Sequence, residues 1–242
     1  MAEYFSEDGV LASYLGAQVI SGAGDAGLFC AVKHLVLMET EGHRNPHTSV
    51  WLSEQALRKI YLKPFELALK NARKTIRYIG DKTEEIKTRT MRGGDCIMTG
   101  DCAVGTYWTA TNYELLTQVI RGEWGFQGFI LSDMNLNSNS NRVDMMLRSG
   151  CDALMSTSYG EKGNAQDFAS ATGVMRLRNA IKNICYSTVN SNLMQGAAPG
   201  STIHYAISPW KVWLILGDIT AGVPMLVGGV WLWRRRRDEK SN

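Results

Sequence analysis

Apolar residues fall along this chain in two patterns, short unbroken runs and longer stretches with helical spacing. The stretch from Ser6 to Ala26 has helical spacing, and the acidic residues near its start suit the dipole of a helix. Its apolar stripe consists of Val10, Leu11, Tyr14, Leu15 and Val19. The following run, Leu28 to Val32, is continuous, which is typical of a buried parallel strand, and it ends in Lys33 and His34. We therefore predict a helix followed by a strand with two polar side chains at its end.

The same alternation continues as far as residue 190. Further strands are predicted at 96–99, 129–132 and 152–155. Further helices are predicted at 53–73 with a restart at Pro64, at 113–121, at 143–148, and at 168–190 with Ile181, Ile184 and Val189 on one face. The charged residues 74–94 are predicted to form a surface excursion. Strands that alternate with helices predict a parallel sheet.

The number of strand–helix units constrains the fold class. A closed β/α barrel needs eight units in about 250 residues, whereas residues 1–195 hold four. An open half-barrel would leave two strand edges unpaired, which folded proteins avoid. The predicted fold class is therefore α/β, a partial TIM-type barrel of about four βα units. A partner or a longer parent chain would supply the other half.

The C-terminal part of the chain changes character after a linker at 196–209. Residues 210–233 carry almost no charge, with Asp218 as an exception, and they are long enough to span a bilayer. Tryptophans mark both ends, and the run Arg234 to Arg237 follows at once. We predict a transmembrane helix that leaves the barrel part outside the cytoplasm and residues 234–242 as a basic cytoplasmic tail. A buried core helix followed by a solvated basic tail is the alternative.

Charge and the arrangement of potential metal ligands bear on whether the chain binds nucleic acid or a metal ion. The net charge of +3 is small and is concentrated in the arginine run, so a nucleic-acid-binding face is not indicated. Possible zinc ligands lie between residues 39 and 47, and they are Glu39, Glu41, His43 and His47. Pro46 breaks the helix that would align the two histidines. We expect no metal ion and no cofactor.

Four stretches in a fixed order resemble a known family. They are Glu3–Asp8 (EYFSED), Ala31–Arg44 with its Lys-His pair, Leu57–Glu66 (LRKIYLKPFE) and Leu115–Asp133 with its EWGF segment. Each is weak alone, and together they resemble the second half of the catalytic barrel of glycoside hydrolase family 3 β-glucosidases. Residues 183–192 and the spanning helix resemble a subset in which the barrel comes last and a membrane anchor follows it.

The resemblance implies a retaining mechanism and indicates its residues. In such enzymes a carboxylate attacks the anomeric carbon, and a second carboxyl group about 5–5.5 Å away acts as acid and base. Asp133 follows the predicted strand 129–132 and corresponds to the nucleophile, at the strand end where barrels place catalytic groups. Lys33 and His34 correspond to the pair that holds the sugar. The acid/base glutamate of the family lies in another domain.

Three further positions bear on substrate binding. Arg44, together with Glu41, fits the adjoining loop of the family as a supporting ion pair. Asp101 stands where the family has a tyrosine beside the nucleophile, and a second negative charge there would repel the Asp133 carboxylate. Met134 replaces a tryptophan, so an aromatic platform for the sugar is lost.

Different functions remain open from the sequence. The first hypothesis is a β-glucosidase-like glycosidase that releases terminal β-linked glucose, or a relative such as xylose, from oligosaccharides, with no turnover by this chain alone. Its partners would be the oligosaccharide, the missing half-barrel with the second domain, and the lipid bilayer. The alternative is a non-catalytic, membrane-anchored module that binds carbohydrate or scaffolds a partner. A soluble α/β domain of unrelated function is the third.

Overall fold

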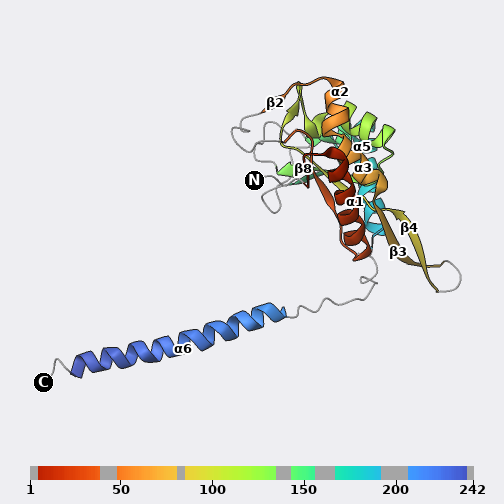
Figure 1. Ribbon diagram of the computed structural model, residues 1–242. Coiled ribbons are helices and arrows are strands. Elements are labelled where there is room, and N and C mark those ends of the chain that lie inside the picture. Colours follow the sequence, from red (N-terminus) through yellow and green to blue (C-terminus); the bar gives the residue numbers. More distant parts are fainter. Residues whose placement is uncertain are drawn as a thin grey trace. The chain divides into compact units, whose positions relative to one another are not determined.

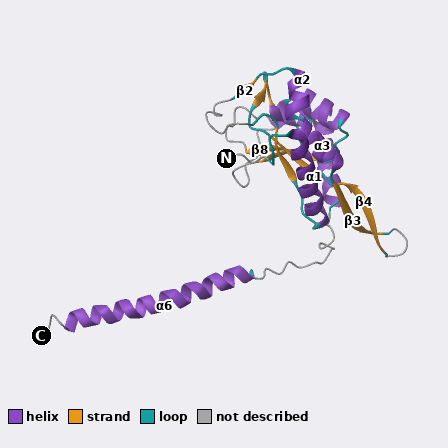
Figure 2. Ribbon diagram, in the orientation of Figure 1, coloured by secondary structure: helices purple, strands orange, loops and turns teal. Residues whose placement is uncertain are grey.

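The computed structural model describes residues 5–38, 48–80, 85–134, 143–155, 167–191 and 207–238. The chain divides into two compact units, Met1–Ala198 and Pro199–Asn242. In the first unit helices and strands alternate around a parallel sheet, and the second unit contains one long helix, α6 (Figures 1 and 2).

The described elements follow the predicted alternation, with some additions. The strands are β1 (Ala31–Leu35), β2 (Ser49–Val50), β3 (Arg73–Ile79), β4 (Ile86–Arg92), β5 (Cys96–Thr99), β6 (Ala103–Val104), β7 (Tyr107–Trp108), β8 (Phe129–Met134) and β9 (Ala153–Met155). The α-helices are α1 (Gly9–Asp25), α2 (Glu54–Ala56), α3 (Lys63–Asn71), α4 (Val143–Ser149), α5 (Ala171–Val189) and α6 (Pro209–Asp238). The π-helices η1 (Leu57–Tyr61) and η3 (Glu114–Glu123) and the 3-10 helix η2 (Thr109–Thr111) lie between them.

The central sheet is parallel, and its strands lie in the order β1-β5-β8-β9. Ala31 pairs with Cys96, and Cys96 pairs with Phe129, so each returning segment adds a strand beside the previous one. Helices connect these strands, which is the repeating unit of a β/α barrel. The predicted α/β class with a parallel sheet is confirmed. A smaller sheet, β2-β6-β7, and the hairpin β3-β4 were not predicted.

The start of β1 differs from the sequence prediction. The strand begins at Ala31 rather than at Leu28 and runs to Leu35, so Lys33 and His34 lie inside it instead of at its end. The reason is local, because the chain first turns at Gly27, whose φ of +88° favours glycine, and pairing with β5 begins only at Ala31. The second predicted strand, by contrast, coincides with β5.

The core lies where the helices that connect the strands meet the sheet. Leu116 and Ile120 of η3 are fully buried. They belong to the same cluster as Ile97 of β5 and Ile130 of β8. Burying an aliphatic side chain of this size stabilises a fold by about 1.5–3 kcal/mol. The predicted restart at Pro64 is confirmed, since α3 has this proline in its first turn.

The first and last helices of this unit, α1 and α5, bury small residues instead of their apolar stripes. On α1 the predicted stripe from Val10 to Val19 is 41–59% exposed, and Gly16 faces Ala68 of α3. On α5 Ile181 and Val189 are exposed. The buried positions of α5 are Gly173, Ala180 and Ser187. Amphipathic patterning alone would direct both stripes toward the core, but contacts through small residues leave them on the surface.

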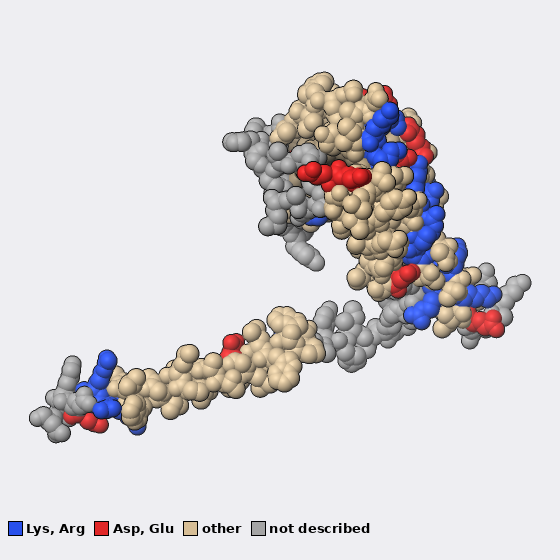
Figure 3. Space-filling view, viewed as in Figure 1, with Lys and Arg blue, Asp and Glu red and all other residues tan. Residues whose placement is uncertain are grey.

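The predicted surface excursion is an antiparallel hairpin, β3 paired with β4 along its length. Most of its side chains are exposed, and basic side chains form a band along one side of the body (Figure 3). Lys74 is an exception, because it is 1% exposed and its ammonium forms a salt bridge with Asp95, which is 4% exposed. This buried pair ties the base of the hairpin to the segment that leads into β5.

Helix α6 is the one described helix that is long and apolar enough to cross a bilayer, by length and composition. It runs from Pro209 to Asp238 and therefore continues into the arginine run, beyond its predicted end. Its 30 residues span roughly 45 Å, more than the hydrocarbon core of a bilayer. Near its ends Lys211, Arg235 and Arg237 lie 5.5–5.7 Å from the ring centres of nearby tryptophans.

The Lys74–Asp95 pair predicts a large effect of removing one partner. Lys74→Met leaves the Asp95 carboxylate buried without its counter-charge, and we expect a loss of about 3–5 kcal/mol in the free energy of unfolding. Lys63→Met is the matched control, since Lys63 pairs with Glu66 at a more exposed position and its loss costs about 1 kcal/mol or less. Urea unfolding of the full chain in detergent, followed by circular dichroism, measures both. Equal losses would contradict the prediction.

Gly128 predicts a second effect on stability. A Cβ at this position would collide with the carbonyl oxygen of Asp95, in a segment whose backbone is held by the pairing of β5 with β8. Gly128→Ala should lower the free energy of unfolding by about 1–3 kcal/mol. Gly22→Ala in α1, where nothing lies within 4 Å of the added methyl, should be neutral or stabilise by up to about 1 kcal/mol. The same urea titration measures both variants, and an unchanged unfolding midpoint for Gly128→Ala would refute the steric reasoning.

Candidate functional site

Three strands bring polar side chains to one edge of the sheet. β8 extends to Met134, two residues beyond its predicted end, so Asp133 lies within the strand rather than after it. His34 is near the C-terminal end of β1, and Asp101 follows the end of β5 by two residues. The carboxyl ends of parallel strands share an edge, and this is the edge at which β/α barrels place their functional groups.

The Asp133 carboxyl has one oxygen that is fixed by hydrogen bonding and one that is not. Oδ1 accepts a hydrogen bond from the Met134 amide at 2.7 Å. Oδ2 lies 3.6 Å from His34 Nε2 and accepts no hydrogen bond from the described residues. The buried Ser132 hydroxyl donates to the Asp133 carbonyl at 2.8 Å and accepts from the Met155 amide at 3.1 Å, which joins β8 to β9. The backbone of Asp133 is therefore held in position while Oδ2 faces the imidazole.

This setting gives the carboxyl group specific chemical abilities. The side chains of Asp133 and His34 are 12% and 17% exposed, so water reaches them only in part, and electrostatic interactions are stronger than in solution. A carboxylate oxygen without a hydrogen bond can attack an electrophilic carbon. The imidazole can hydrogen-bond a ligand hydroxyl, and in its protonated form it stabilises the carboxylate charge.

Lys33 and His34 also line a hollow of about 560 Å³ beside β1. Residues of α1, η1 and α3 provide most of the other wall, and much of it is apolar. Asp133 is not part of this lining, so His34 is the described link between the hollow and the carboxyl group. The peptide bond between Lys33 and His34 is cis. The structure therefore brings His34 directly to Asp133 and places Lys33 in the adjoining hollow.

The two positions that depart from the family pattern lie at the same strand edge. Asp101 is buried, and its amide donates to the Met38 sulfur at 3.2 Å, which connects the segments after β5 and β1. Met134 is the last residue of β8 and is exposed.

Some expected residues lie outside the described part of the chain. They are Glu39, Glu41, His43, Arg44 and His47. Within the described ranges, no group of three or more His, Cys, Asp or Glu side chains is arranged to hold a metal ion.

The opposite edge of the sheet carries two buried carboxyl groups that the sequence analysis missed. Asp95 directly precedes β5, and Asp152 precedes β9. Asp152 accepts hydrogen bonds from the Ile130 amide at 2.7 Å and from Asn183 Nδ2 at 2.9 Å, and it forms a salt bridge with Arg121. Burial raises the pKa of both aspartates, and their basic partners oppose that shift. An aspartate immediately before an apolar strand was the available signal in the sequence.

Comparison with known proteins identifies the family. The sequence profile of the Glycosyl hydrolase family 3 N terminal domain matches residues 1–185. The chain belongs to glycosyl hydrolase family 3. The family resemblance inferred from the four sequence stretches is thereby confirmed, and the parallel-sheet unit is similar to the N-terminal barrel domain of this family.

Individual relatives agree with this assignment. A β-glucosidase of Ruminococcus albus is 30% identical over 203 residues, which cover 79% of this chain and 19% of that protein. The solved β-glucosidase of Paenibacillus barengoltzii has a TM-score of 0.63 and 27% identity, covering 84% of this chain and 21% of that one. β-Glucosidase 3B of Thermotoga neapolitana in complex with α-D-glucose has a TM-score of 0.62 and 25% identity, covering 80% of this chain and 25% of that one. The chain thus spans about a fifth to a quarter of the length of these relatives.

Proposed function

We propose that this chain supplies the nucleophile and part of the sugar subsite of a retaining glycosidase that removes terminal β-linked glucose, or a related sugar, from oligosaccharides. The observation that carries the proposal is Asp133 Oδ2, 3.6 Å from His34 Nε2 and without a hydrogen-bond donor among the described residues. The β-glucosidases among its relatives support the substrate class.

The proposed reaction has two displacements at the anomeric carbon. In the first, an Asp133 oxygen bonds to this carbon while the glycosidic C–O bond breaks and a carboxylic acid gives its proton to the departing oxygen. In the second, that group, now a carboxylate, takes a proton from water, and the water oxygen displaces Asp133. By resemblance to the family, the acid/base glutamate belongs to another domain. We therefore expect no turnover from the described unit alone.

The remaining site residues take part in binding under this proposal. His34, next to the reactive oxygen, hydrogen-bonds a hydroxyl close to the anomeric carbon. Lys33 adds an ammonium group at the wall of the adjoining hollow. Asp101 and Met134 form part of the rim of the sugar subsite.

A non-catalytic module that binds carbohydrate is the second candidate function. Its support is Asp101, which is buried at the strand edge of Asp133 where the family pattern has a tyrosine. An acidic residue replaces an aromatic one at this edge, which changes the surroundings that a catalytic sugar subsite of the family has.

We also propose that α6 anchors the chain in a membrane, with the first unit outside the cytoplasm. The run Arg234 to Arg237 at the C-terminal end of the apolar stretch supports this orientation, because basic residues flank spanning helices on the cytoplasmic side. Asp218 lies about two turns into the helix, where an acidic side chain costs less than at the bilayer centre.

A chimera tests the nucleophile assignment. In it, residues 1–185 replace the matching segment of the Ruminococcus albus β-glucosidase, which supplies the remaining barrel and domains. The chimera should hydrolyse an aryl β-glucoside, and Asp133→Asn should lower kcat on the order of 10³-fold or more, because removal of a nucleophile leaves only binding and electrostatic stabilisation. A 2-fluoro-glucoside with a good leaving group should add one sugar mass to the peptide that contains Asp133.

Asp25→Asn is the matched control for this experiment. Asp25 Oδ1 accepts a hydrogen bond from the Thr75 amide. The side-chain oxygen of an asparagine can accept the same hydrogen bond, so activity should not change. If Asp133→Asn retains the activity of its parent, the nucleophile is another residue. Glucose binding without turnover and without a covalent adduct would favour the second candidate function.

The membrane proposal predicts the labelling of one thiol. Cys185 on α5 is exposed, whereas three other cysteines are buried: Cys96, Cys102 and Cys151. In intact cells that express the full chain, an impermeant maleimide should label Cys185 from outside, and Cys185→Ser should remove most of the signal. The protein should stay with the membrane in alkaline carbonate. Labelling of Cys185 only after cell lysis would indicate the opposite orientation. Release of the protein from the membrane by carbonate would exclude a spanning helix.

A further inference from the structure

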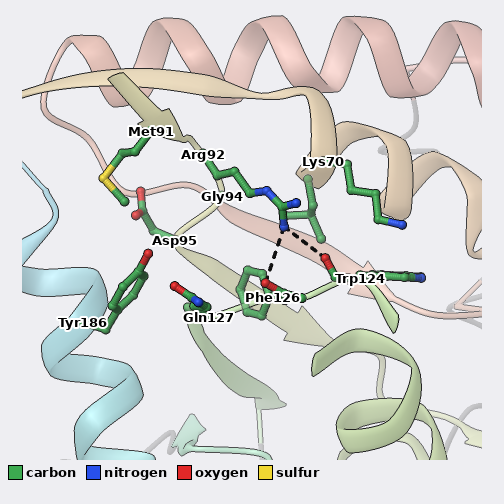
Figure 4. Close-up of a pocket in the computed structure, with 12 residues that line it drawn as sticks. Lys70, Met91, Arg92, Gly94, Asp95, Trp124, Phe126, Gln127 and Tyr186 are labelled. Atoms are coloured by element: carbon green, nitrogen blue, oxygen red, sulfur yellow. Dashed lines mark hydrogen bonds between the residues drawn. The ribbon is translucent and has the colours of Figure 1, made fainter. Parts of the chain in front are cut away.

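A second cavity lies at the opposite end of the sheet from Asp133. It has a volume of about 330 Å³ and is bordered by α3, β4, the segments that lead into β5 and β8, and the end of α5 (Figure 4). Asp95 and Gly128 of its lining directly precede β5 and β8, so the cavity is at the N-terminal strand ends. Its volume is near the lower end of the range for small-molecule sites, about 300–1,000 Å³.

The lining includes a buried carboxyl group with one unsatisfied oxygen. Asp95 forms a salt bridge with Lys74 through Oδ1, and its carbonyl accepts a hydrogen bond from Ser187 Oγ at 2.8 Å. Oδ2 is buried but has no hydrogen-bond partner among the described residues. A buried acceptor without a donor is unfavourable and is uncommon in folded proteins. A ligand that donates a hydrogen bond to Oδ2 would remove this cost.

Other polar groups converge on the same part of the cavity. Figure 4 shows the Gln127 amide and the Tyr186 hydroxyl on the side of the cavity where the Asp95 carboxyl lies. Arg92 is directed elsewhere, since its Nη1 donates to the Trp124 carbonyl at 3.0 Å and holds the loop before β8. The cavity thus offers an acceptor, an amide and a hydroxyl within one small space.

The charge of the lining selects the class of ligand. Lys74 neutralises Asp95, and Lys70 is paired with Glu66 at 2.7 Å, while Arg92 adds positive charge. A cation would therefore be repelled, and an anion would meet the unsatisfied carboxyl oxygen. Neutral hydroxyl groups can both donate to a carboxylate and accept from an amide. The apolar part of the lining, including Phe126, suits the C–H groups of a sugar ring.

We propose that this cavity binds a neutral polyhydroxylated molecule of about monosaccharide size, with one hydroxyl donating to Asp95 Oδ2. The Met91 side chain borders the cavity near the carboxyl group in Figure 4. A change of its rotamer would give the ligand access to the covered oxygen, as the flexibility of methionine allows. The proposal is independent of the role assigned to Asp133, which lies at the other end of the strands.

Methyl resonances of methionine test this proposal in the full chain. Met91 lines this cavity, and Met134 adjoins Asp133, so each methyl group reports one site. The chain is labelled with 13C-methyl methionine in detergent, Met91→Leu assigns the first resonance, and D-glucose is titrated. The Met91 resonance should shift with saturation. Tyr186→Phe should raise the half-saturating concentration about fivefold, the effect of one lost hydrogen bond.

Controls separate this cavity from the site at Asp133. Tyr78→Phe, on the exposed hairpin, should leave the Met91 titration unchanged, and so should Asp133→Asn. Gln127→Ala replaces an exposed side chain without disturbing the Lys74–Asp95 pair and should also weaken the response.

Several outcomes would overturn the proposal. A Met91 resonance that is unmoved or drifts without saturation means that the cavity holds only water. Equal responses of the parent, Tyr186→Phe and Gln127→Ala mean that these groups do not bind the ligand. Saturation by methylammonium or by inorganic phosphate, but not by glucose, assigns the cavity to a charged ligand instead.

Discussion

Strand β5 lies between β1 and β8 in the parallel sheet, and the contact of His34 with Asp133 depends on this double pairing. Neighbouring strands lie about 4.8 Å apart, so the backbones of β1 and β8 are separated by about twice that distance. The 3.6 Å approach of His34 Nε2 to Asp133 Oδ2 therefore depends on the reach of the two side chains, which extend from the flanking strands toward each other. The end of β5 is compact, because Gly100 follows Thr99 and a Cβ there would lie 3.3 Å from the Val36 carbonyl oxygen.

The position of α1 and α5 beside this sheet bears on why both helices expose apolar side chains. β1 and β9 each have one strand neighbour in the described sheet. Close to these edges, α1 exposes its apolar stripe, and α5 exposes Ile181 and Val189. Large apolar side chains that are exposed together on one helix occur at interfaces. Relatives of this chain are several times longer. The exposed apolar residues of α1 and α5 are thus candidates for contact with other protein surface.

The sequence predicted elements well where one local signal dominates. The unbroken run at 96–99 coincides with β5, and Pro64 restarts a helix as expected. Prediction was poorer where tertiary contacts set the bounds or the orientation of an element. The start of β1 is set by its pairing partner, and the orientation of α1 is set by the contact of Gly16 with Ala68, which no periodicity reveals.

The candidate site follows the same rule. The position of Asp133 near a strand end was visible in the sequence, because a polar residue follows an apolar run. Its neighbour His34 lies about a hundred positions earlier, and only the order of the strands brings the two together. Asp95 was not predicted as a site residue because it precedes a strand, where an aspartate normally indicates a turn. Its burial depends on Lys74 from the unpredicted hairpin.

Asp133 and Asp95 illustrate how similar groups acquire different chemistry at the two ends of one sheet. Each carboxyl has one engaged oxygen and one oxygen without a hydrogen bond. Asp95 forms a salt bridge with a buried lysine, which disfavours attack by its carboxylate on an electrophile. Asp133 Oδ1 is held by a backbone amide, and its Oδ2 faces the imidazole of His34 without accepting a hydrogen bond from the described residues. The partner of the first oxygen decides what the second one does, which is why we assign reaction to one end of the strands and recognition to the other.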